Sequence, residues 1–112
     1  MMQTVVEMNY YAARAAKLLT ASERDAVINT VAVDPHQGDL IEGTGGVRKL
    51  RFAIGGRGKS GGIRVIYYYY NENTPVFLFS LFAKNEKDNL SKADCNVLAQ
   101  TVAVIKKKLK GN

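Results

Sequence analysis

Three strand-like segments in the middle of the chain restrict most strongly what this sequence can fold into. They are Val47–Ile54, Ile63–Tyr70 and Val76–Ala83, and each is rich in β-branched or aromatic residues. In the first segment apolar and charged residues alternate, which is typical of a strand with one covered face. A glycine-rich stretch follows the first segment, and Asn71–Pro75 predicts a hairpin turn after the second. Strands joined by short turns pair antiparallel, so we expect one mostly antiparallel sheet.

Periodicity before and after these strands predicts three helices. Tyr10–Leu19 is rich in Ala and Leu, with apolar residues at helical spacing. Thr20–Val33 begins with a capping-box pattern, and Asp34-Pro35 ends it. Ser91 precedes a third helix that runs to about Leu109 and ends in lysines, as the helix dipole favours. Its predicted inner face carries Ala93, Val97, Leu98, Val104, Ile105 and Leu109.

The remaining segments complete the predicted order. Thr4–Met8 is short and β-prone, and the glycine-rich segment His36–Gly46 predicts a loop between the second helix and the strands. The expected order is therefore βααβββα, in a single domain that covers residues 1–112. This order predicts an α+β fold, with a mostly antiparallel sheet and the helices packed on one of its faces.

Composition excludes several classes of protein. Hydrophobic residues make up 46% of the chain and charged residues 23%, which is typical of a folded protein and not of a disordered one. No apolar run reaches the roughly 20 residues of a membrane span, and the N-terminus lacks the pattern of a signal peptide. One Cys and one His exclude a disulfide framework and a zinc site built by a single chain. We expect a cytoplasmic domain without a metal or cofactor.

Positive charge is concentrated in one part of the sequence. The formal net charge is +6, but residues 1–46 contain more acidic than basic residues. The segment Val47–Arg64 contains no Asp or Glu, and its basic residues are Arg48, Lys49, Arg51, Arg57, Lys59 and Arg64. Such a block predicts a surface that binds a polyanion. Because the block is strand-like and not an amphipathic helix, it favours nucleic acid over a membrane surface.

The glycine-rich segment Gly55–Ser60 has a second interpretation. It ends in Gly-Lys-Ser, as does the phosphate-binding loop of many nucleotide-binding proteins. That signature also requires a glycine where this chain has Ala53, and a helix where a strand follows here. The sequence therefore disfavours a nucleotide site, and we interpret the segment as a hairpin loop.

Basic residues of different strands are predicted to share one face of the sheet. Lys49 and Arg51 are two positions apart and point to the same side. Arg64 lies at the start of the next strand, and Lys84 follows the third. These cations are either an ordinary solvated face or an anion-binding site, and the lack of counter-charges favours the second interpretation. The tyrosines expected on this face, which either stack on bases or fill a half-buried sheet, are Tyr68 and Tyr70.

Three strings occur in order between Gly43 and Ser91: GTGGVRKLRFA, GRGKSGGIRVIYYY and VFLFSLFAKNEKDNLS. They combine a basic-apolar-basic strand, a glycine-rich hairpin, an Arg-Val-Ile-Tyr strand and an Ala-Lys-Asn-Glu ending. This combination resembles the RelE/ParE superfamily of toxins from bacterial and phage type II toxin–antitoxin systems. Within it, the chain is most similar to the HigB-like branch, which is described as phage-derived.

The resemblance implies a ribosome-dependent endoribonuclease that cuts mRNA in the decoding site of the small ribosomal subunit. In such enzymes the ribose 2′-hydroxyl attacks the adjacent phosphodiester, which requires a base, cations for the phosphorane and an acid for the leaving oxygen. The family's catalytic motif falls on Lys49, Arg51, Arg64 and Lys84. Lys49 is the candidate base. Residues implied to contact RNA or the ribosome are Arg48, Arg57, Lys59, Tyr68 and Asn85.

The resemblance also implies partners and shows departures. The expected partners are mRNA on the ribosome and a helix-turn-helix antitoxin encoded nearby, through which alone the chain would contact DNA. Several family members carry an arginine where this chain has Asn85, and a histidine or aromatic acid near the C-terminus, whereas no Tyr or His follows Tyr70 here. Lys84 or the ribosome then supplies the acid. The alternatives are a non-catalytic RNA-binding module and a corepressor of the antitoxin.

Overall fold

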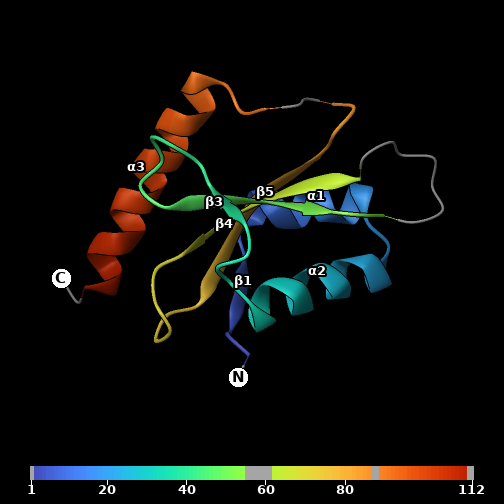
Figure 1. The fold of residues 1–112 in the computed structure, drawn as a ribbon, viewed down its shortest axis with the longest axis horizontal. Helices are drawn as coiled ribbons and strands as arrows, with labels where there is room; N and C mark the ends of the chain where they lie inside the picture. Colours follow the sequence, from blue (N-terminus) through green and yellow to red (C-terminus); the bar gives the residue numbers. More distant parts are fainter. Residues whose placement is uncertain (1, 55–61, 87–88, 111–112) are drawn as a thin grey trace.

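The protein forms a five-stranded sheet with three helices (Figure 1). The computed structural model describes residues 2–54, 62–86 and 89–110. The elements are β1 (Val5–Glu7), α1 (Asn9–Leu18), α2 (Ala21–Val33), β2 (Asp39–Leu40), β3 (Val47–Phe52), β4 (Ile63–Tyr69), β5 (Val76–Ala83) and α3 (Lys92–Leu109). The strand order is β1-β5-β4-β3-β2, with β1 parallel to β5 and the other pairs antiparallel. The predicted α+β class and the mostly antiparallel sheet are confirmed.

One strand was not expected from the sequence. Asp39–Leu40 pairs with Lys49 and Arg48 at the edge of the sheet, within the segment predicted to be a loop. A strand of two residues is too short to show an alternation of apolar and polar residues in the sequence. It forms because its neighbour β3 offers an unpaired edge. The observed order is therefore βααββββα.

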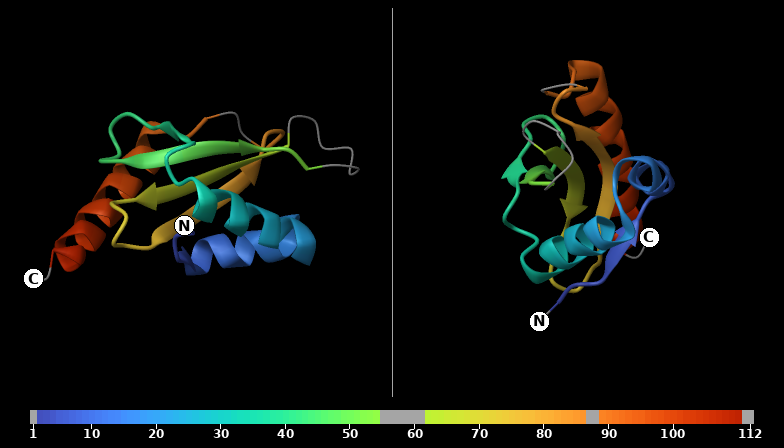
Figure 2. Two further views of the ribbon diagram at one scale, coloured as in Figure 1. Left: turned by 60° about the horizontal axis from the view of Figure 1, so that its bottom comes forward. Right: turned by 90° about the vertical axis from the view of Figure 1, so that its right-hand side faces the viewer.

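The helices cover both faces of the sheet. Figure 2 shows α1 and α2 together on one side and α3 apart from them. The first core lies under α1 and α2 and includes Tyr11, Val27, Val65 and Leu78, whereas the second lies under α3. The expectation of helices on one face holds for α1 and α2 but not for α3. The reason is that six of the seven residues of β4 are buried, so that both of its faces need an apolar cover.

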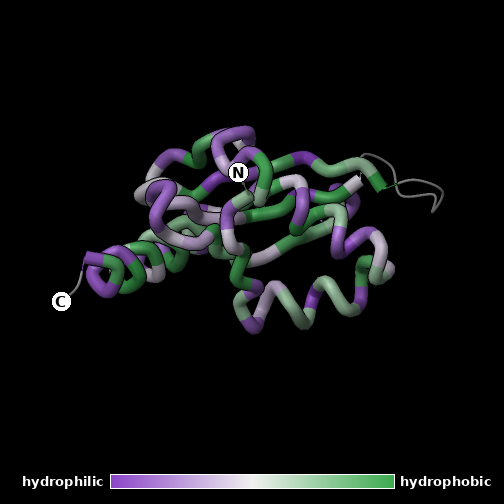
Figure 3. Tube along the Cα trace, turned by 90° about the horizontal axis from the view of Figure 1, so that it is seen from below, coloured by the Kyte–Doolittle hydropathy of each residue, from purple (hydrophilic) through white to green (hydrophobic). Residues whose placement is uncertain are grey.

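The second core explains which side of α3 faces the sheet. Val102 is 2% exposed and packs with Leu98 and Ile105 against the sheet. Val97 and Val104, predicted to face inward, are 61% and 57% exposed. α3 contacts the sheet along a narrow stripe only. The apolar residues of the helix cover a wider part of its surface than this stripe, so some of them remain exposed. Figure 3 shows hydrophobic segments through the central strands and mixed segments along the helices.

Side-chain caps set the beginnings of two helices. The Thr20 hydroxyl accepts a hydrogen bond from Glu23 N at 3.1 Å, and the Glu23 carboxylate accepts one from Thr20 N at 2.9 Å. Ser91 and Asp94 make the same reciprocal pair at the start of α3. The sequence pattern predicts the first box and the N-cap Ser91, and both are confirmed.

The segment before β2 is fixed from the sheet by a buried tyrosine. The Tyr67 hydroxyl donates to Pro35 O at 2.8 Å and accepts from Gly38 N at 2.9 Å. A side chain at Gly38 would meet this hydroxyl, since a Cβ there would lie 2.7 Å from the Tyr67 oxygen. Glycine at this position therefore allows the loop to approach the sheet, which brings β2 into register with β3.

Candidate nucleic-acid interface

Strand register brings three predicted basic residues to one face of the sheet. Arg51 on β3 is paired directly with Arg64 on β4, and Lys49 is paired with Ile66. Residues that are directly opposite in an antiparallel pair point to the same side, and positions two apart on a strand do so too. This side is the one that carries Ile66 and the second core. We call Lys49, Arg51, Arg64 and Lys84 the basic face.

The basic face places like charges against each other. Two guanidinium groups on directly opposite residues are unfavourable by a few tenths of a kcal/mol to about 1 kcal/mol. Arg64 is only 6% exposed, and its Nη1 donates to the Ile63 carbonyl at 3.3 Å, whereas Arg51 is exposed. A buried cation next to an exposed one is an arrangement that an anionic ligand would stabilise.

Lys84 and Asn85 follow the end of β5. Lys84 N donates to Gly62 O at 3.2 Å, which continues the β4–β5 pairing by one position. Phe82 is paired with Arg64, so the alternation of side chains places Lys84 on the Arg64 side of the sheet. Both Lys84 and Asn85 are exposed. The structure thus brings Lys84 into the group predicted for it.

Asn89 is a residue of this surface that the sequence did not indicate. Its Oδ1 accepts a hydrogen bond from Lys49 Nζ at 3.3 Å, across 40 positions of sequence. Asn89 lies just before the cap of α3, and neither its residue type nor its spacing distinguishes it from an ordinary turn residue. On the other side of Lys49, β2 places Asp39 directly opposite, so a carboxylate borders the basic face at this edge of the sheet.

Two predicted RNA-contacting residues lie elsewhere. Arg48 points to the side of α1 and α2, and its Nη1 donates to His36 O at 3.0 Å and to Gly38 O at 2.8 Å. This arginine therefore fixes the loop before β2, and it is not part of the basic face. The prediction that Arg48 contacts RNA was based on the positive charge of the segment Val47–Arg64. Side chains alternate along a strand, however, so Arg48 points to the opposite side of the sheet from Lys49.

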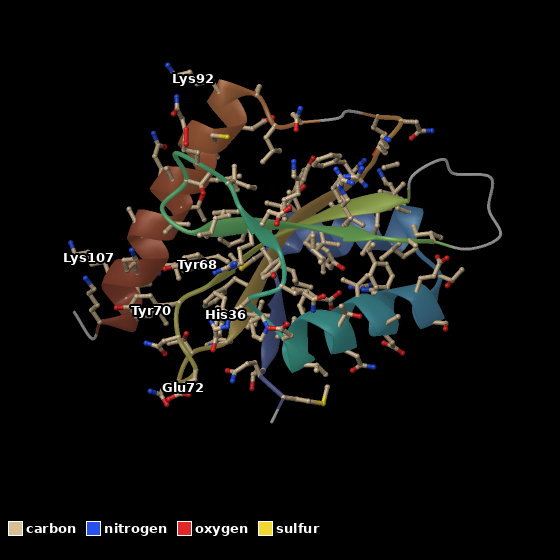
Figure 4. The ribbon with its side chains drawn as sticks, viewed as in Figure 1. His36, Tyr68, Tyr70, Glu72, Lys92 and Lys107 are labelled. Atoms are coloured by element: carbon tan, nitrogen blue, oxygen red, sulfur yellow. The ribbon has the colours of Figure 1, made fainter. Side chains whose placement is uncertain are left out.

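Tyr68 lies inside the second core. It is 2% exposed, and its ring stacks with those of Phe77 and Phe79 at centroid distances of 6.4 and 6.3 Å. Burial raises the pKa of its hydroxyl. Figure 4 shows Tyr68 and Tyr70 beside α3, and Lys106 Nζ lies 5.9 Å from the Tyr70 ring centroid. A covered Tyr68 cannot stack on a base, so the interpretation as a sheet-filling residue is the correct one for this tyrosine.

The other predicted contacts, Arg57 and Lys59, fall outside the residues that the structure describes. In the described part of the chain, no three His, Cys, Asp or Glu side chains gather as a metal site would require. No helix of that part is long and apolar enough to cross a membrane.

An apolar groove adjoins the basic face. It has a volume of about 540 Å³ and lies between the start of α1, the sheet and the first half of α3. Ile66, the partner of Lys49 across the strands, is part of its wall. The groove is lined by Met8, Tyr10, Phe79, Ser80, Val97 and Leu98, among others.

Comparison with known proteins agrees with this architecture. The fold is similar to that of an E. coli RelE toxin, solved in the free state as a double arginine-to-alanine mutant, with a TM-score of 0.56 and 17% sequence identity. The similarity covers 79% of this chain and 90% of that one. A family model described as the RelE toxin of the RelE/RelB toxin–antitoxin system matches residues 8–111. Because this match spans nearly the whole chain, the protein belongs to the RelE toxin family.

Proposed function

We propose that this toxin is a ribosome-dependent endoribonuclease that cuts mRNA and thereby inhibits translation. The observation that supports this most directly is the pairing of Arg51 with Arg64 beside Lys49, in a chain of the RelE family. Three cations from two strands share one side of the sheet, with Arg64 buried, Lys49 half-buried and Arg51 exposed, so that a phosphodiester could reach them from the open side of the sheet. Such a site suits a long substrate that is held in place by another particle.

The arrangement suits attack by a ribose 2′-hydroxyl on the neighbouring phosphorus. The neutral amine of Lys49 accepts the hydroxyl proton and becomes an ammonium group, and Asn89 Oδ1 orients this Nζ through the 3.3 Å contact. Arg51 and Arg64 stabilise the charge that develops on the phosphorane oxygens. Lys84 lies toward the leaving 5′-oxygen and donates a proton to it, or the ribosome does so. The products are a 2′,3′-cyclic phosphate, which water opens to a 3′-phosphate in a second step, and a free 5′-hydroxyl.

A comparison of naked and ribosome-bound mRNA tests this proposal. We expect purified protein to leave naked mRNA intact and to cut the same mRNA on programmed ribosomes, with new ends inside codons. Arg51→Ala serves as the site variant, and Lys107→Ala, which removes the same charge at the far end of α3, serves as its control (Figure 4). Rapid cutting of free RNA, or equal cutting by wild type and Arg51→Ala, would contradict the proposal.

A second candidate is a non-catalytic RNA- or ribosome-binding module with the same basic face. It is favoured by one feature of the sequence, the lack of any Tyr or His after Tyr70 that could serve as the general acid. This function predicts ribosome binding and growth arrest without new mRNA ends. Mapping the 5′ ends of mRNA after expression in cells therefore separates the two candidates.

The proposal includes a place and a partner. We propose that the toxin acts in the cytoplasm, belongs to the HigB-like branch of its family, and is neutralised by a helix-turn-helix antitoxin encoded beside it. The sequence strings between Gly43 and Ser91 support the branch, and the excess of positive charge on the basic face supports an acidic partner segment. An adjacent reading frame for a small helix-turn-helix protein, whose product binds the toxin, is the expected finding.

A further inference from the structure

On the edge of β5 that faces β1, the last part of the strand is supported by a side chain instead of by a strand. β1 pairs with Val76–Leu78, whereas β5 continues to Ala83. Arg14 of α1 lies beside this extension, and its Nε donates a hydrogen bond to Leu81 O at 3.1 Å. The guanidinium thus satisfies a backbone carbonyl on the β5 edge that lies beyond the end of β1.

The same arginine also reaches the turn that follows β5. Its Nη2 lies 2.5 Å from Glu86 Oε1, and that oxygen also accepts a hydrogen bond from Ala83 N at 2.8 Å. The backbone of Glu86 closes the turn as well, since Glu86 N donates to Ala83 O at 2.9 Å. Lys84 and Asn85 are the two residues inside this turn. Its conformation therefore decides where they stand relative to β4.

We propose that Arg14 and Glu86 are positioning residues for the basic face, because together they hold the turn that keeps Lys84 beside Arg64. The inference rests on the proposed function, in which Lys84 lies toward the leaving oxygen of the RNA. A second effect of the Arg14–Glu86 pair would also favour RNA binding. Arg14 binds the Glu86 carboxylate at the α1 edge of β5, and a carboxylate held there competes less with RNA for the cations of the basic face.

Because this ion pair is partly exposed, an effect on the position of Lys84 can be distinguished from an effect on the stability of the fold. The side chains of Arg14 and Glu86 are 25% and 39% exposed, and exposed pairs contribute little to the stability of a fold. The chain offers a matched control in the ion pair between Arg24 Nε and Glu7 Oε2, at 2.7 Å and 32% and 25% exposed. That pair joins α2 to β1 and holds no residue of the basic face.

The experiment compares alanine variants of the two pairs. Cleavage of mRNA on programmed ribosomes, the melting midpoint and amide exchange at Ala83 are measured for Arg14→Ala, Glu86→Ala, Arg24→Ala and Glu7→Ala. We expect cleavage to fall at least about tenfold in the first two variants, with Ala83 exchanging faster, and to stay at the wild-type level in the controls. The melting midpoints should shift equally in both pairs. Glu86→Gln retains an acceptor oxygen for Ala83 N and should recover most of the cleavage.

Three results would overturn the inference. Cleavage that falls in proportion to the melting midpoint in both pairs would assign Arg14 and Glu86 a structural role only. Faster exchange at Ala83 with unchanged cleavage would show that the position of Lys84 is irrelevant. If the wild type does not cut mRNA at all, the proposed function is contradicted, and affinity for a 2′-methoxy RNA decides the inference instead. Weaker binding by Glu86→Ala than by wild type then supports it, and equal binding overturns it.

Discussion

The two faces of the sheet are built from the same strands but differ in what they hold. The face under α1 and α2 is apolar along most of its length, with Val65, Leu78 and Leu81 at 0% exposure. The opposite face is divided: α3 covers an apolar part around Ile66 and Phe79, and the basic face occupies the rest. A sheet that is fully covered on one side can carry unfavourable charge pairs on the other, because the first core supplies stability that does not depend on them.

The largest expected effect comes from breaking the fully covered face. Leu78→Ala removes a side chain with 0% exposure from the first core, and the cavity should destabilise the fold by about 2–5 kcal/mol. Chemical denaturation measures this change in the free energy of unfolding. Arg51→Ala, on an exposed position of the other face, is the control and should change it by less than about 1 kcal/mol. Equal losses would mean that both faces carry the fold.

The next effect concerns the divided face alone. Arg64→Ala should abolish toxicity and lower mRNA cleavage by about 10²–10³-fold, since it removes a cation that we propose stabilises the phosphorane. The circular-dichroism spectrum should remain that of the folded protein. Arg64→Lys, which retains the charge but not the paired N–H donors, should recover part of the cleavage. Loss of the folded spectrum in Arg64→Ala would show that this residue belongs to the core and not to the site.

Association with the proposed antitoxin should respond to salt if, as we propose, the partner covers the divided face. We expect the association rate to fall about tenfold or more as ionic strength rises, since charges are screened beyond a Debye length of about 8–10 Å. The apolar groove beside the basic face should keep dissociation slow and insensitive to salt. Stopped-flow mixing of wild type, Arg51→Glu and the double variant Arg57→Glu/Lys59→Glu measures both rates. Flat association rates with normal binding of the charge reversals would place the antitoxin on another surface.

The smallest effect tests whether Tyr68 belongs to the core or to the interface. Its hydroxyl is buried and has no hydrogen-bond partner among the described residues, so Tyr68→Phe should change the free energy of unfolding by less than about 1 kcal/mol. Cleavage and RNA affinity should be unchanged. Tyr68→Ala, which empties the space beside Phe77 and Phe79, is the comparison variant and should lower the free energy of unfolding more than Tyr68→Phe does. An RNA affinity that depends on the Tyr68 hydroxyl would contradict the assignment to the core.

Local patterns in the sequence were sufficient for most of the fold. The alternation in Val47–Ile54, the capping box at Thr20 and the cap at Ser91 each depend on interactions within a few residues, and the structure contains all three. Spacing within a strand likewise placed Lys49 and Arg51 on one side of the sheet. Such features are readable because the physics that produces them acts between neighbours in sequence.

Other features depend on contacts between distant segments. The burial of Tyr68, the outward position of Val97 and the inward turn of Arg48 all follow from where α3 and the loop before β2 pack. Asn89 meets Lys49 across 40 positions, and Arg14 meets Glu86 across 72. No local pattern marks either pair.

The sequence by itself determined the fold class, the position of the helices and of every strand except β2 along the chain, and the concentration of positive charge in Val47–Arg64. The tertiary structure decided which of those charges share a face, which tyrosines are covered, and which side chains hold the turn after β5. The physical reason is that alternation and capping are set by the chain's own neighbours. The cover of a face depends instead on the apolar area that remains after every other element has packed.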